Sequence, residues 1–181
     1  MRPLESRRRV IGLGNAWRGD DAAGLACLAA LRGRVPADVA LIDSDGDPAA
    51  LLEQLSGAAE VYLIDACRSG DVPGTVHRVK VAAHHPLFLP NGATSSHGLG
   101  LATALELART FGRVPAQCQL FAIEAGDCTL GVPLGEAVRT AVERVAQEIQ
   151  CRLSPPRPAR SGSEVSAPAC GAQPGRTPWS R

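Results

Sequence analysis

The stretch Val10-Ile-Gly-Leu-Gly-Asn-Ala-Trp-Arg-Gly-Asp-Asp-Ala-Ala-Gly24 joins a short apolar run to an Ala- and Leu-rich segment. The apolar run is typical of a buried strand in a parallel sheet, and the second segment favours a helix to about Arg32. Gly12 and Gly14 are expected to let the backbone turn between them. Asp20 and Asp21 are expected at the cap and first turn of the helix, where free N–H groups and the positive helix end favour carboxylates. The pair therefore indicates either helix capping or a site for a cation.

The same stretch resembles the opening of a dinucleotide-binding fold. A strand, a Gly-x-Gly turn and a helix are present, but Trp17 stands where a third glycine is expected. Such a fold offers the helix N-terminus to a pyrophosphate, which Asp20 and Asp21 would repel. Binding of a nucleotide or another small ligand is therefore the less favoured hypothesis.

The composition argues against a nucleic-acid-binding protein and against a membrane-spanning one. The 181 residues are 45% hydrophobic and carry a net charge of +1, which fits one domain with a substantial core and no surface for nucleic acid. No apolar stretch is long enough to cross a membrane. The six cysteines include no C-x-x-C pair, so they are expected to be reduced thiols of a cytoplasmic protein.

Strand and helix patterns alternate along the chain. They predict an α/β fold, a three-layer sandwich with a mostly parallel five-stranded sheet and helices on both faces. Strands are expected at 8–13, 39–43, 60–65, 75–81 and 117–124, and helices at about 21–32, 48–55, 95–111 and 135–153, with Ser95 or Ser96 capping the third helix. No helix fits before the fourth strand, so that strand is expected to be antiparallel to the third strand or to lie at an edge. Residues 1–153 are expected to form one domain, and the Pro-, Arg- and Ser-rich residues 154–181 a disordered tail.

Titratable residues gather where the predicted strands end. Asp21 follows the first strand, Asp65 ends the third, Glu124 ends the fifth, and His97 begins a helix on the same edge, where ligands bind in such sheets. The positive helix end is expected to keep His97 neutral. Two carboxylates and a neutral imidazole are a common ligand set for a divalent transition metal with open coordination positions.

Each of these residues could also have a purely structural role or a different chemical one. His97 could cap or pack a helix, and Asp65 could form a turn at the end of a strand. Cys67 could be a nucleophile with His97 as its base, although no third group is evident to orient the histidine.

Three segments together resemble the hydrogenase maturation proteases. They are the stretch from Gly12 to Gly24, Leu63-Ile-Asp-Ala66, and Ser96-His-Gly-Leu-Gly-Leu101, and the resemblance extends from about Val10 to Ile149. It implies an endopeptidase that removes a C-terminal extension from the large-subunit precursor of a nickel-iron hydrogenase once nickel is in place. It also places the metal-contacting residues of the family on Asp21, Asp65 and His97.

In such proteases the nickel belongs to the substrate, so the resemblance implies residues that test for a nickel-loaded precursor and no permanent cofactor. The precursor is the expected partner, and the protein is expected to be a monomer. The commoner His-Gln-Leu-Gly pattern is His97-Gly-Leu-Gly100 in this chain, so no glutamine side chain is available for a substrate contact at residue 98, which suggests a different subgroup or a different large subunit. A metal-sensing chaperone that docks on the precursor without cutting it is the alternative on the same fold.

Overall fold

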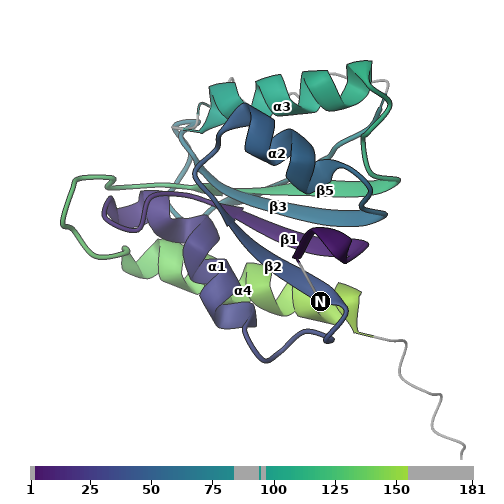
Figure 1. The fold of residues 1–181 in the computed structure, drawn as a ribbon. Helices are drawn as coiled ribbons and strands as arrows, with labels where there is room; N and C mark the ends of the chain where they lie inside the picture. Colours follow the sequence, from purple (N-terminus) through teal and green to yellow (C-terminus); the bar gives the residue numbers. More distant parts are fainter. Residues whose placement is uncertain (1–2, 84–93, 95–96, 155–181) are drawn as a thin grey trace, which may run out of the picture.

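A five-stranded sheet in the order β2-β1-β3-β5-β4 forms the centre of the molecule (Figure 1). The structure, a computed structural model, describes residues 3–83, 94 and 97–154. β2, β1, β3 and β5 are parallel to one another, and β4 is antiparallel to β5. The expected mostly parallel sheet is therefore confirmed. The strands span Arg8–Leu13 (β1), Val39–Ser44 (β2), Glu60–Cys67 (β3), Val76–Lys80 (β4) and Gln117–Glu124 (β5).

Two details of the sheet differ from the expectation. β4 lies at an edge, as one alternative predicted, but its neighbour is β5 and not β3. β3 is already paired with β1 and β5, so the unpaired side of β5 is where an antiparallel strand can add. β3 also continues past Asp65 to Cys67, because β5 pairs with it as far as Glu124. Asp65 therefore lies inside a strand and not at its end.

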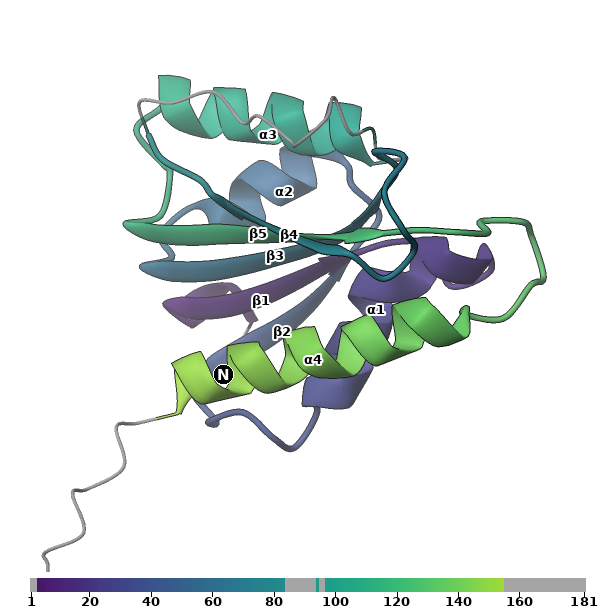
Figure 2. The same ribbon diagram turned by 180° about the vertical axis from the view of Figure 1, so that it is seen from behind.

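Helices cover both faces of the sheet, as predicted. α1 and α4 pack against each other on one face, and α2 and α3 pack against each other on the opposite face (Figures 1 and 2). Each face has its own apolar core. Among the described residues no helix has the length and apolar character needed to cross a membrane. The helices are α1 (Ala23–Leu31), α2 (Pro48–Leu55), α3 (Gly98–Thr110) and α4 (Glu136–Leu153), with short 3-10 helices η1 (Pro3–Glu5) and η2 (Gly19–Ala22).

Two expectations fall on residues outside the described part of the chain. These are the cap of α3 at Ser95 or Ser96 and the tail beyond Ser154. In the described residues, His97 occupies the N-cap position of α3, and its side chain makes no capping hydrogen bond.

β1 and α1 approach so closely that only glycine fits at their contact. A Cβ atom on Gly12 would lie 2.5 Å from the carbonyl oxygen of Gly24, and one on Gly24 would lie 2.2 Å from that of Leu13. Gly12 was expected in the turn, but it lies within β1. Its lack of a side chain lets the start of α1, with η2 before it, pack directly against the end of β1.

The edge strand β4 is tied to α4 by an ion pair. Arg78 Nη2 lies 2.8 Å from Glu148 Oε2, and Arg152 Nη2 lies 2.9 Å from Glu148 Oε1. The hydrogen bond from Arg78 is the main reason that the pKa of Glu148 lies below its ordinary value. Because the carboxyl group is only partly buried, we expect a small effect on stability.

Substituting Glu148→Gln is expected to lower the free energy of unfolding at neutral pH by less than about 1 kcal/mol. The folded pKa is lowered, so the contribution of the carboxylate is present above its unfolded pKa and is lost as the pH falls through the folded pKa. Urea unfolding of both proteins at neutral and at acidic pH checks this. A difference that stays constant into acid would contradict it.

Candidate active site

The N-cap position of α1 is Ala22 and not either of the two adjacent aspartates. The aspartates lie in the η2 turn, and α1 begins only at Ala23. Both side chains are nevertheless buried, with 3% and 4% of Asp20 and Asp21 exposed. The expected position at the cap and first turn of α1 is therefore wrong, because the two residues belong to a separate tight turn that directs their carboxylates into the protein.

Asp20 holds the loop between β5 and α4. Its Oδ2 accepts hydrogen bonds from the N–H groups of Gly126 at 2.8 Å and Asp127 at 3.1 Å, and its Oδ1 accepts one from Gly135 at 2.7 Å. These partners follow Asp20 by more than a hundred residues, so no local pattern indicates the role. Asp20 fixes the loop that forms one side of the candidate site.

Substituting Asp20→Ala is expected to lower the free energy of unfolding by about 1.5–3 kcal/mol, because hydrogen bonds to a charged group are lost and backbone donors are left unpaired. Urea denaturation measures this change. Asp43→Ala is the matched control, because Asp43 is exposed and 3.7 Å from Arg32, so its removal should change stability by less than about 0.5 kcal/mol. Equal losses in the two variants would contradict the assigned role.

Asp65 and His97 meet at the carboxyl edge of the sheet. Asp65 Oδ1 lies 3.5 Å from His97 Nδ1 and also accepts a hydrogen bond from Ala66 N–H at 2.9 Å. Both side chains are largely buried. The segment before α3 is held to the end of β3 by paired backbone hydrogen bonds between Arg68 and Thr94.

The pKa of His97 shifts in the opposite direction to the one expected from the helix end. The hydrogen bond with Asp65 raises the pKa of His97 above its ordinary value, burial opposes this, and the charges of Asp65, Asp21 and Asp45 add to the increase. Asp21 and Asp45 belong to η2 and to the β2–α2 loop. Carboxylates from three separate segments thus outweigh the burial of the ring, and they create a region that favours a positive charge.

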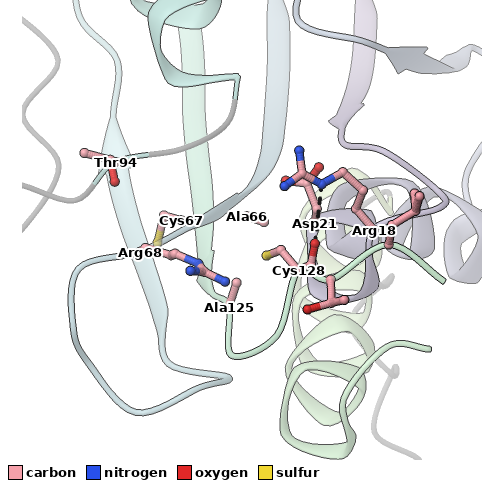
Figure 3. Close-up of a pocket in the computed structure, with 10 residues that line it drawn as sticks. Arg18, Asp21, Ala66, Cys67, Arg68, Thr94, Ala125 and Cys128 are labelled. Carbon is pink, nitrogen blue, oxygen red and sulfur yellow. Dashed lines mark hydrogen bonds between the residues drawn. The ribbon is translucent and has the colours of Figure 1, made fainter. Parts of the chain in front are cut away.

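Asp21 lines an open pocket of about 800 Å³ (Figure 3). Arg18 and Cys128 lie with Asp21 on one side of it, and Cys67 and Arg68 lie on the other. Arg18 Nε donates to the Cys128 carbonyl at 3.4 Å. The exposed side chain of Leu130 also contributes to the lining. The pocket therefore offers two cations and an apolar side chain beside a buried carboxylate.

A second group of titratable side chains lies on the same side of β3, β5 and β4. The ligand atoms of Cys67, His77 and Glu124 all lie within 4.8 Å of one another, and the three residues are buried. Glu124 accepts hydrogen bonds from Ser69 and Gly70, which outweigh its burial and lower its pKa. His77 was not among the residues expected at a site, although a histidine in a short strand of alternating character can indicate one.

Cys67 is a poor candidate for a nucleophile. Burial first, and then the nearby charge of Glu124, raise the pKa of its thiol to about 12. The reactive form of cysteine is the thiolate, which this environment disfavours. A histidine that sequence patterns did not link to Cys67, His77 from β4, lies within 4.8 Å of its sulfur.

Comparison with known proteins supplies the family. A model of the hydrogenase maturation proteases matches residues 27–151, a span that includes Asp65 and His97 and begins after Asp21. A search of curated protein sequences gave no match.

Solved structures share the fold. The hydrogenase maturating endopeptidase HybD from E. coli has a TM-score of 0.69 and 24% identity over 81% of this chain and 91% of that chain. An endopeptidase from Escherichia coli has a TM-score of 0.69 and 25% identity, covering 78% of this chain and 89% of that one. The NiFe hydrogenase maturation protease HybD from Thermococcus kodakarensis has a TM-score of 0.68 and 22% identity, covering 82% and 99%. The matched residues make up more than half of the chain, and the protein therefore belongs to the hydrogenase maturation protease family and is an endopeptidase.

Proposed function

We propose that this endopeptidase removes the C-terminal extension of a nickel-iron hydrogenase large-subunit precursor after nickel insertion, and that Asp21, Asp65 and His97 detect the nickel. The observation that carries the proposal is the concentration of negative charge around one imidazole. Asp65 contacts His97 directly and is the main cause of the raised pKa of that residue, and the charge of Asp21 adds to the increase. Family membership favours this function over a non-cleaving chaperone or a nucleotide-binding protein.

The nickel ion is part of the substrate and arrives with the precursor. Its positive charge would take the place of the proton that the carboxylates favour on His97. Carboxylate oxygens and an imidazole nitrogen are suitable ligands for such an ion. Held in this way, the ion fixes the position of the precursor, and the metal or a carboxylate can polarise the scissile carbonyl and activate a water molecule.

The pocket beside Asp21 suits the peptide to be cut. It is open, lies next to the carboxylate proposed to meet the nickel, and has an exposed Leu130 and the cations of Arg18 and Arg68 in its wall. An extended peptide can use such a surface through its apolar side chains and carbonyl groups. The scissile bond would then lie between the bound nickel and the pocket.

The proposal is tested by incubating the protein with nickel-loaded and nickel-free precursor. The mass of the large subunit reports removal of the extension. We expect the loaded precursor to be cut and the nickel-free precursor to stay intact. Equal cleavage of both would contradict nickel detection, and an unchanged mass of the loaded precursor would contradict this choice of substrate.

A further inference from the structure

We infer that Cys67, His77 and Glu124 form a second metal site, separate from the residues proposed to meet the substrate nickel, and that it binds a divalent transition-metal ion such as Zn²⁺. The three side chains come from β3, β4 and β5. They offer a sulfur, a nitrogen and an oxygen atom, which is a donor set that zinc accepts.

The distances between the donor atoms fit a tetrahedral ion. Glu124 Oε2 lies 3.5 Å from Cys67 Sγ and 3.7 Å from His77 Nε2. With ordinary zinc–sulfur, zinc–nitrogen and zinc–oxygen bond lengths, tetrahedral ligand atoms lie about 3.3–3.8 Å apart. The third pair, Cys67 Sγ and the ring nitrogen of His77, lies within 4.8 Å, so an ion could bind all three atoms after a small adjustment of the side chains.

The buried ring of His77 gives independent evidence that a ligand binds between these three side chains. Its side chain is only 9% exposed, and its Nε2 atom is buried with no hydrogen-bond partner among the described residues. The nitrogen is directed at Glu124 Oε2 and at Asp71 Oδ2, which lies 3.5 Å away. Buried polar atoms are nearly always satisfied, so an unpaired nitrogen in this position indicates a missing ligand.

The charge of the proposed ligands and the hydrogen bonds that orient Glu124 also fit a bound cation. When Cys67 gives up its proton to solvent on binding, the thiolate and the carboxylate together carry two negative charges, which a divalent ion neutralises. The Glu124 carboxylate is already oriented by Ser69 Oγ at 2.8 Å and Gly70 N–H at 3.0 Å, the kind of outer contact that fixes a metal ligand. Asp71 or a water molecule can supply the fourth ligand.

The bound ion would stabilise one wall of the pocket that Asp21 and Cys67 line. Cys67 contributes to the pocket lining, and its partners belong to the neighbouring strand β5 and to the edge strand β4. The ion would therefore join three strands beside the proposed peptide site without taking part in the cut itself.

The test is a titration of the metal-free protein with Co²⁺, which substitutes for zinc and gives a sulfur-to-cobalt charge-transfer band when a thiolate binds. We expect the wild-type protein to show the band and Cys67→Ser to lose it. His77→Gln should weaken the affinity by more than about 100-fold, because loss of an outer contact alone costs about 10- to 100-fold. Cys128→Ser is the matched control, because Cys128 lines the same pocket and its loss should leave the band intact.

Two further measurements distinguish loss of this metal site from loss of the nickel-detecting residues and from unfolding. His97→Ala should retain the cobalt band, since that residue belongs to the site proposed for the substrate nickel. The melting temperature without metal shows whether each variant is folded, and Zn²⁺ should raise it for the wild-type protein but not for His77→Gln. If the wild-type protein gives no band in excess Co²⁺, or if the band survives in Cys67→Ser, the second site is refuted.

Discussion

Replacing Asp65 with asparagine, or His97 with alanine, is expected to reduce cleavage of the nickel-loaded precursor by about 100-fold or more. Removing even an outer partner of a metal site costs about 10- to 100-fold, and these two side chains are in direct contact with each other. Asp65→Asn keeps the shape of the side chain and an acceptor for Ala66 N–H, so the loss should come from the missing charge. The initial rate of precursor cleavage, followed by mass, measures the effect.

Asp43→Ala is the matched control for the loss of a carboxylate. Asp43 lies on β2 near the same edge of the sheet, but its side chain is 63% exposed. We expect this variant to cut the loaded precursor at the wild-type rate. Asp21→Ala is expected to reduce cleavage as Asp65→Asn and His97→Ala do. Wild-type cleavage by all three of these variants would refute the proposed nickel-detecting site.

Substituting Gly46→Ala is expected to reduce cleavage by about 100-fold, because a displacement of about 1 Å at a reacting group can cost that much. Gly46 has a φ of 86° and packs against the ring of His97. A Cβ atom there would lie 2.9 Å from His97 Cβ and 3.0 Å from Cδ2. The backbone of the β2–α2 loop cannot easily withdraw, because a Cβ on the neighbouring Gly100 would itself lie 2.0 Å from the Gly46 carbonyl oxygen.

Gly57→Ala separates displacement of His97 from backbone strain. Gly57 has a similar φ of 74°, but a Cβ atom there would meet nothing within 4 Å. Both variants should lose about 1–2 kcal/mol of stability from the unfavourable φ, as measured by urea unfolding. Only Gly46→Ala should lose cleavage. If the two variants cut equally well, Gly46 does not position the histidine.

Local patterns were enough to find most elements. The bounds of β1, α2 and β5 were predicted correctly, because apolar runs and a helix-starting proline act within a few residues. The rule that parallel strands end at one edge also indicated that Asp65 and His97, far apart in the chain, would lie together. Contact between these two side chains bears out that part of the expectation.

The direction of the pKa shift of His97 could not be predicted from its own helix. The helix end was visible in the sequence, but the carboxylates that raise the pKa of His97 come from β3, η2 and the β2–α2 loop. Electrostatic energy depends on distance in space, and those distances are set only when the strands are ordered in the sheet.

The sequence by itself determined the alternating α/β pattern, the glycine-rich acidic stretch and the set of residues available at one edge of the sheet. Only the tertiary structure decided what each carboxylate does. Asp20 binds a loop that follows it by more than a hundred residues, and Glu124 lies beside Cys67 and His77 because β5 is placed between β3 and β4. The reason is physical: hydrogen bonds and charges act over a few ångströms, and chain folding alone decides which side chains come that close.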